Sequence, residues 1–159
     1  TVSQKNATRI ILGSMPGKAS LAVDQYYAHP RNHFWSFIES IMEIQQSLPY
    51  ETRCARLVDC GVAIWDVLKT CTRTSSLDSD IVESSIVPND FGAFLTTHSN
   101  ISNIYFNGAT AEKIYTKHVL PLLPSKSSEI PITRLPSTSP ANASIPLGKK
   151  LDQWNTILR

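Results

Sequence analysis

Several features that mark particular classes of protein are missing from this chain of 159 residues. Its three cysteines, Cys54, Cys60 and Cys71, form no C-x-x-C pair, so we expect reduced thiols and no metal site, neither zinc nor iron–sulfur. No apolar run in the sequence approaches the length of a membrane span, and the first residues do not resemble a signal peptide. These absences favour a cytoplasmic protein that does not contact a membrane.

The chain also lacks a strong charge of either sign. It has 15 Lys and Arg against 13 Asp and Glu, and the resulting net charge of +2 is too small to indicate a nucleic-acid partner by itself. The motifs G-x-G-x-x-G and G-K-[ST] are absent, which argues against a nucleotide- or flavin-binding α/β protein. Hydrophobic residues make up 42% and charged residues 18%, as in ordinary globular proteins, and the length is that of one domain, 1–159.

Buried-strand patterns alternate with helical patterns along the chain. Apolar runs predict strands at residues 9–13, 62–65, 104–106 and 132–135. Apolar residues at helical spacing predict helices at 32–45, 51–60, 91–97, 109–118 and 147–158. The last helix is expected to place Leu151, Trp154 and Leu158 on one face, and residues 70–80 to form a polar loop. This alternation predicts a three-layer α/β/α sandwich around a central, mostly parallel four-stranded sheet.

Two polar clusters follow strands of this predicted sheet. The first consists of the loop 13–17 and the aromatic-rich segment 26–35, and the second is the loop 135–142. Because the carboxyl ends of parallel strands meet at one edge of a sheet, these segments are expected to line one crevice, together with Asp66 and Asn107. Flat rings, an amide and free backbone amides suit a planar ligand that forms hydrogen bonds.

The same segments resemble the uracil-DNA glycosylase superfamily. GSMPG (13–17), YYAHPRNHFW (26–35), WDV (65–67) and LPSTSPAN (135–142) look most like its hypoxanthine-DNA glycosylase (deoxyinosine glycosylase) branch, which is related to the mismatch-specific uracil/thymine-DNA glycosylases. The resemblance implies a monofunctional DNA glycosylase that hydrolyses the N-glycosidic bond of deaminated bases, hypoxanthine first, in base excision repair. It further implies DNA as the partner, double- or single-stranded, a monomer, no cofactor, and a nucleoid location in a prokaryote.

Two positions depart from the usual catalysts of this superfamily. Met15 stands where the mismatch-specific branch has an Asn that positions the attacking water, and a thioether cannot orient water. Ser137 stands where classical uracil glycosylases have a His. In the hypoxanthine branch the catalytic amide is thought to come from the NHFW-like segment, so the resemblance implies that Asn32 holds a water against C1′ of the deoxyribose. The alternative is that Asn32 only caps the following helix.

The resemblance also implies a set of base-binding residues. Tyr27 would stack on the extruded base, and the alternative is a core tyrosine, which is the favoured interpretation for its neighbour Tyr26. Asp66 would accept N1–H of hypoxanthine and repel the bare N1 of adenine, while uracil N3–H would also satisfy it. The alternative for Asp66 is a helix cap or an ion pair. His29 would protonate or hydrogen-bond a purine leaving group, unless it only holds its loop. The first loop supplies the other positions: Gly13, Ser14, Met15 and Pro16.

The second loop is the expected contact with the DNA helix. Phosphate donors are expected at Ser137, Thr138 and Ser139. Ala141 would be a small plug for the gap that the extruded base leaves, Asn142 would contact the widowed partner base, and Lys149 and Lys150 would add phosphate contacts. The alternatives are an ordinary Ser/Pro loop and, for the two lysines, the solvated start of a helix. Three other functions remain open: a uracil-directed enzyme, a xanthine-directed enzyme, and a non-catalytic binder of damaged DNA.

Overall fold

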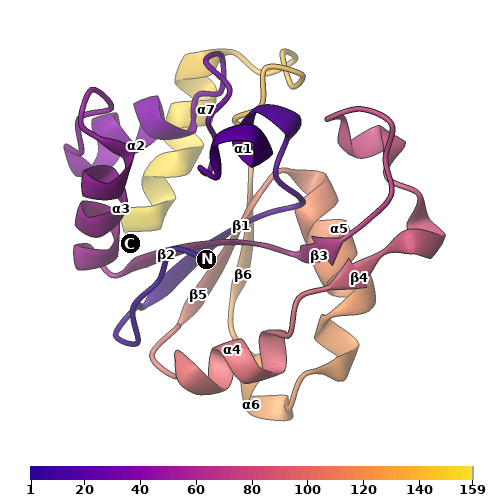
Figure 1. Cartoon of the computed structure of the whole chain (residues 1–159). Coiled ribbons are helices and arrows are strands. Elements are labelled where there is room, and N and C mark those ends of the chain that lie inside the picture. Colours follow the sequence, from indigo (N-terminus) through magenta and orange to yellow (C-terminus); the bar gives the residue numbers. More distant parts are fainter. Residues whose placement is uncertain (159) are drawn as a thin grey trace.

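A central parallel sheet organises the computed structural model, which describes residues 1–158 (Figure 1). The strand order is β2-β1-β5-β6, and each neighbouring pair runs parallel. The bounds of these strands are β1 (Arg9–Gly13), β2 (Val62–Asp66), β5 (Asn103–Asn107) and β6 (Ile132–Leu135). The predicted fold class is confirmed. Arg159, the last residue of the predicted domain 1–159, lies outside the described residues.

Helices cover both faces of this sheet (Figure 1). The helices are α1 (Lys18–Val23), α2 (Phe34–Met42), α3 (Tyr50–Asp59), α4 (Phe91–Thr97), α5 (Ala109–His118), α6 (Ser125–Ser128) and α7 (Leu147–Trp154). Ile11 packs with α2, α3 and α7 in one hydrophobic cluster, whereas Ile10 and Leu12 pack with α4 and α5 in the other. Alternate side chains of β1 therefore enter opposite cores, which explains why this strand reads as a continuous apolar run.

The order of the strands fixes the position of the site. The chain passes from β1 to β2 through α1, α2 and α3, and then crosses to β5 through α4, which packs on the other face. The chain therefore adds β2 on one side of β1 and β5 on the other. At such a reversal of strand order, a crevice is expected between the carboxyl ends of the two neighbouring strands, here β1 and β5. Gly13 and Asn107 stand at those two ends.

Two predicted helices have different ends in the structure. Helix α2 ends at Met42 rather than at Gln45, because Glu43 adopts a left-handed conformation with φ of 59°. Helix α7 passes into a 3₁₀ helix, η4 (Asn155–Leu158). Its tighter winding turns Ile157 into the core and leaves Leu158 53% exposed, so the prediction of Leu158 on the apolar face is wrong.

The polar stretch after β2 holds more structure than the sequence predicted. Strand β3 (Leu68–Thr70) pairs antiparallel with β4 (Val87–Pro88), and the 3₁₀ helices η1 (Asp78–Asp80) and η2 (Glu83–Ser85) lie between them. A further 3₁₀ helix, η3 (Leu120–Leu122), follows α5. Elements this short contain no repeated spacing of apolar residues, so they cannot be predicted from the pattern of the sequence. Among residues 1–158 no helix has the length and apolar character that a membrane span requires.

Candidate functional site

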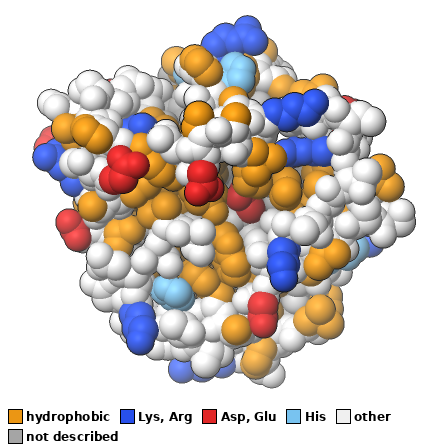
Figure 2. All heavy atoms as spheres, viewed as in Figure 1, with side chains coloured by type: hydrophobic (Ala, Val, Ile, Leu, Met, Phe, Trp, Pro, Cys, Tyr) orange, Lys and Arg blue, Asp and Glu red, His pale blue; other side chains and the backbone are white. Residues whose placement is uncertain are grey.

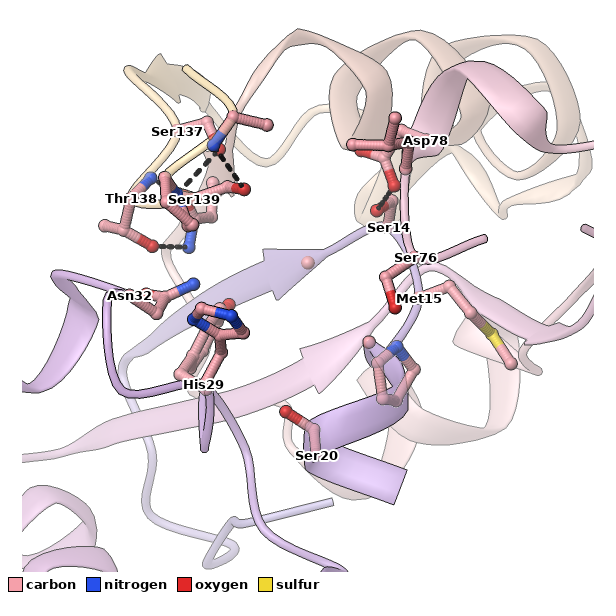
Figure 3. Close-up of a pocket in the computed structure, with 18 of the residues that line it drawn as sticks. Ser14, Met15, Ser20, His29, Asn32, Ser76, Asp78, Ser137, Thr138 and Ser139 are labelled. Carbon is pink, nitrogen blue, oxygen red and sulfur yellow. Dashed lines mark hydrogen bonds between the residues drawn. The ribbon is translucent and has the colours of Figure 1, made fainter. Parts of the chain in front are cut away.

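A cavity of about 670 Å³ opens at the carboxyl edge of the sheet. Four segments form its walls: the first loop (13–17), the segment 26–32, the turn 76–79 and the second loop (137–142). Figure 3 shows Asn32 and His29 facing Ser14, Ser76 and Asp78 across the cavity. The site residues inferred from the sequence all line it: Gly13, Ser14, Met15, Pro16, Tyr27, His29, Asn32, Asp66, Ser137, Thr138, Ser139, Ala141 and Asn142. Their predicted convergence is confirmed, whereas their individual roles stay predictions.

Asp66 brings a buried carboxylate into this cavity from the end of β2. Its side chain is 6% exposed, and none of the described residues donates a hydrogen bond to its carboxylate or pairs with it in a salt bridge. A Cβ atom on Gly13 would stand 2.5 Å from Asp66 Oδ1, so glycine leaves the space that the carboxylate occupies. Burial raises the pKa of the Asp66 carboxyl to about 7, and the negative charge of Asp78 adds to the rise. Near neutral pH, Asp66 therefore changes from a protonated carboxyl group, which can donate a hydrogen bond, to a carboxylate, which only accepts.

Tyr27 stands beside Asp66 in an unusual backbone conformation. Its φ of 57° lies in the left-handed region, which aromatic residues seldom adopt. The ring stacks on Phe34 with centroids 3.9 Å apart and an interplanar angle of 16°. Burial raises the pKa of the Tyr27 phenol, as does the charge of Asp66, so the phenol keeps its proton. Its buried hydroxyl has no hydrogen-bond partner of standard geometry among residues 1–158, although the Asn107 side chain lies close enough to act against the rise in its pKa. The hydroxyl hydrogen is therefore available to a ligand.

Asn32 lies directly before His33, the N-cap residue of helix α2, and its side chain contacts the start of that helix. Its Oδ1 accepts the backbone N–H of Phe34 at 2.9 Å, and its own N–H donates to the His29 carbonyl at 2.8 Å. The side chain therefore satisfies the first N–H group of the helix, as the capping alternative requires, but it does so from the position before the N-cap residue. Because Phe34 N–H can only donate, the side-chain oxygen must face the helix, and Figure 3 shows the Asn32 nitrogen directed into the cavity. The amide thus offers the cavity two N–H groups, while Oδ1 retains one lone pair.

His29 is exposed at the mouth of the cavity and also shapes its own turn. Its Nδ1 accepts the backbone N–H of Arg31 at 3.1 Å, which supports the loop-holding alternative. A neutral ring with this hydrogen bond carries its hydrogen on Nε2. His29 therefore presents an N–H donor to a bound ring.

The first loop is held in place by contacts with the core and with the segment 73–78. Met15 packs against the core beneath α4 and α5, and Figure 3 shows its sulfur directed away from the other labelled residues. Ser14 Oγ donates to Asp78 Oδ1 at 2.6 Å, and the Arg73 guanidinium donates to the Pro16 carbonyl. The Ser14 hydroxyl hydrogen is therefore engaged by Asp78 in this conformation, while the Ser14 oxygen can still accept, and the base contacts of Met15 and Ser14 stay predictions.

Asn107, at the end of β5, holds the second loop. Its Nδ2 donates to Thr138 Oγ1 at 2.8 Å, and its Oδ1 accepts Thr138 N–H at 2.9 Å. Thr138 is fully buried and its carbonyl is also hydrogen-bonded, so the predicted phosphate contact of Thr138 is wrong. Ser137 Oγ and Ser139 Oγ accept backbone N–H groups of their own loop and keep their hydroxyl hydrogens for donation.

Lys150 is buried and stabilises the second loop through hydrogen bonds to its backbone. The side chain is 3% exposed, and its ammonium donates to the Ser137 carbonyl at 2.9 Å and to the Asn142 carbonyl. Burial lowers the pKa of Lys150. The predicted phosphate contact of Lys150 is therefore wrong, whereas its neighbour Lys149 is exposed.

Some residues of the cavity were missed by the sequence analysis. The turn 76–79 and Ser20 line the cavity, although residues 70–80 were read only as a loop. One signal was available: this Ser/Asp-rich stretch follows the carboxyl end of β2, the edge at which the site was expected. The Lys and Arg side chains do not mark the site, because in Figure 2 they are dispersed over the face shown.

Comparisons with known proteins agree with this geometry. Residues 1–158 match the family model of the Uracil DNA glycosylase superfamily. A protein named Hypoxanthine DNA glycosylase from Methanosarcina acetivorans is 32% identical over 159 residues, which cover 99% of this chain and 94% of the relative. Another of that name, from Methanosarcina barkeri, is 36% identical over 108 residues, 67% of each chain.

A solved structure shows the same likeness in three dimensions. The solution structure of a candidate uracil DNA glycosylase from Methanosarcina acetivorans matches with a TM-score of 0.80 at 32% identity, over 99% of this chain and 92% of that one. The sequence match, the structural match and the cavity at the carboxyl edge of the sheet lead to one conclusion. The chain belongs to the uracil DNA glycosylase superfamily.

Proposed function

We propose that this protein is a monofunctional DNA glycosylase that removes deaminated bases from DNA, with hypoxanthine as its main substrate. Two relatives that bear the name Hypoxanthine DNA glycosylase support this substrate. The observation that carries the proposal is the buried Asp66 carboxylate, which lines the cavity with its acceptor positions unoccupied by described residues. An extruded base that donates a hydrogen bond is the ligand such a carboxylate selects.

The position of Asp66 beside Tyr27 favours hypoxanthine over adenine. Hypoxanthine presents an N1–H donor next to the O6 acceptor, which matches a carboxylate acceptor beside a phenol donor. Adenine presents the reverse order, a bare N1 next to an amino group, so both of its groups would face the wrong partner. A buried mismatch of this kind costs several kcal/mol in total, about 1–3 kcal/mol for each unsatisfied group. Uracil also presents N3–H beside a carbonyl, which makes it the second candidate substrate.

The reaction is hydrolysis at C1′ of the deoxyribose. The water oxygen bonds to C1′ while the C1′–N bond breaks and its electron pair leaves with the base. The water loses one proton to solvent, and the departing base takes up one proton at the ring nitrogen that held the sugar, so that the products are a sugar hydroxyl and a free base. The Asn32 amide would position the water, and the Nε2–H of His29 would donate to the departing ring. None of the described residues that line the cavity is a lysine, so no Schiff base is expected and the enzyme is monofunctional.

A panel of duplexes with one hypoxanthine, uracil or xanthine tests this function. Base release is measured as strand cleavage after alkali, with an adenine duplex as the matched control. We expect the fastest release from the hypoxanthine duplex and none from adenine. Tight binding of the lesion duplexes without release of any base would instead show a non-catalytic binder of damaged DNA.

Lys150→Met is expected to raise the KM for a lesion duplex about tenfold while kcat changes less. The substitution removes the only cation that the structure shows on the Ser137 and Asn142 carbonyls, so the loop that contacts DNA becomes mobile. Steady-state kinetics measure the effect, and limited proteolysis measures the loosening of the loop. Lys149→Met, at the exposed neighbouring position, serves as the control for the loss of one positive charge. Equal effects of the two substitutions would contradict the bracing role.

A further inference from the structure

Leu77 differs from the other exposed apolar side chains of this protein. Among residues 1–158, the large hydrophobic side chains with high exposure are Leu21, Val23, Leu77, Val82, Val87, Leu122, Ile132, Leu147 and Leu158. Leu77 is 49% exposed and is the single member of this set that lines the cavity. Isolated apolar residues are normal on a protein surface, but this one stands at the rim of a polar site for a nucleic acid.

The turn that carries Leu77 is held by side-chain hydrogen bonds. Leu77 N–H donates to Ser75 Oγ at 2.9 Å, and Ser75 Oγ donates to Asp80 Oδ2 at 2.5 Å. The next residue, Asp78, accepts from Ser14 Oγ at 2.6 Å, which ties the turn to the first loop. Leu77 is therefore presented to solvent from a fixed backbone, and little further ordering is needed when a partner covers it.

On the opposite rim, the apolar side chains that line the cavity are Pro140 and Ala141, which are smaller than leucine, whereas the exposed Leu147 lines a separate hollow that also borders the second loop. Figure 3 places Ser76 and Asp78, the neighbours of Leu77, across the cavity from Ser137 and Ser139. Ala141 of the second loop has only a methyl group, which fills little of the space that one base occupies in a stack. A nucleotide that leaves the duplex opens a gap of that size, and proteins that distort DNA often place an apolar side chain between bases.

We propose that Leu77 enters the DNA base stack at the lesion and occupies the space of the extruded base, while Ala141 makes only a minor contribution. The inference rests on the proposed function, because it requires a base in the cavity. It assigns the turn 76–79 to the DNA-contacting surface, opposite the second loop. The role concerns opening of a duplex, so Leu77 is a positioning residue and takes no part in cleavage of the glycosidic bond.

The proposal predicts a difference between duplex and single-stranded substrates. A single strand has no paired stack to fill, so Leu77→Ala should leave its cleavage rate unchanged. Release of hypoxanthine from a duplex of the same sequence should fall about tenfold or more, because the cost of unstacking is no longer offset. Leu77→Met, which restores an apolar side chain of similar length, should recover most of the duplex activity.

The test compares wild type, Leu77→Ala, Leu77→Met and the control Leu122→Ala, which removes a leucine that is 79% exposed and outside the cavity. Single-turnover base release is measured on both substrates, and the fluorescence of a 2-aminopurine next to the lesion reports the opened stack. Equal losses on duplex and single strand would mean that Leu77 contacts the extruded base, and no loss on either would mean that it contacts nothing. Both results would overturn the proposal.

The same experiment separates this inference from the proposed function. If wild type releases no base from either substrate, the proposed function fails. The fluorescence signal would still test Leu77, because it requires only binding and opening of the duplex. A 2-aminopurine signal that is unchanged in Leu77→Ala would overturn the inference whether or not the protein is an enzyme.

Discussion

Asn32→Ala is expected to slow single-turnover release of hypoxanthine by about 100- to 1000-fold, the range found when one positioned polar group is removed from an active site. The amide directs its nitrogen into the cavity and keeps one lone pair of Oδ1, so it can hold a water against the sugar. Alanine removes both groups. The rate is measured with enzyme in excess over a hypoxanthine duplex, so that product release does not limit it.

Asn32→Ser is the control that separates catalysis from capping. Serine accepts the Phe34 N–H about as well as asparagine does, whereas alanine gives up that bond at a cost of about 1 kcal/mol. The melting temperature should therefore fall for Asn32→Ala and stay near wild type for Asn32→Ser. The rate should fall for both variants. Full activity in Asn32→Ser would remove Asn32 from the catalytic role and leave it only as a cap.

Asp66→Asn is expected to abolish the pH dependence of hypoxanthine release and to weaken the rejection of adenine. In the wild type, the folded-state pKa of about 7 means that the carboxylate, the form that only accepts, becomes dominant above neutral pH. kcat/KM for hypoxanthine should therefore rise through about pH 7 and then level off. An asparagine side chain also carries N–H donors, which can satisfy the bare N1 of adenine. A rise through pH 7 that persists in Asp66→Asn would assign the titration to another group.

The same substitution is expected to stabilise the fold at alkaline pH. The folded-state pKa of Asp66 lies above the ordinary value of 3.8, so the folded protein retains a proton that the unfolded chain releases. The stability that this protonation contributes is full below about pH 4 and is lost as the pH rises through 7. Asp66→Asn should therefore raise the free energy of unfolding at pH 8 by an amount on the order of 3 kcal/mol, and by less at pH 5. Thermal melts at both pH values measure this, and equal gains at the two would contradict it.

The sequence was most informative about the strands and helices that have a clear apolar pattern. Strands β1 and β6 and helix α5 have the bounds that their apolar patterns predicted. The parallel-sheet rule then brought distant loops to one edge, which is how the cavity was anticipated. The hairpin of β3 and β4 and the turn 76–79 could not be predicted this way, because turns held by serine and aspartate side chains have no apolar period.

The roles of single side chains were harder to predict than their location. Thr138 and Lys150 look like phosphate ligands in a Ser/Lys-rich sequence, yet both are buried. Their burial depends on partners that are remote in the chain: Asn107 for Thr138, and the Ser137 and Asn142 carbonyls for Lys150. The burial of Asp66 and its opening toward the cavity likewise depend on Gly13, which pattern analysis of either strand alone does not reveal.

In this protein the packed sheet provides stability, whereas the loops at its carboxyl edge determine which ligand the cavity accepts. The strands place Gly13, Asp66 and Asn107 at the cavity, while most of the surrounding wall belongs to four loop segments, of which only Met15, Tyr26 and Tyr27 pack against the hydrophobic clusters. Substitutions in those segments can therefore alter which damaged base is accepted while the packing that sustains the fold is preserved. Homologous proteins with this architecture can therefore acquire new substrate preferences through substitutions in these loops, while the stability of the fold changes little.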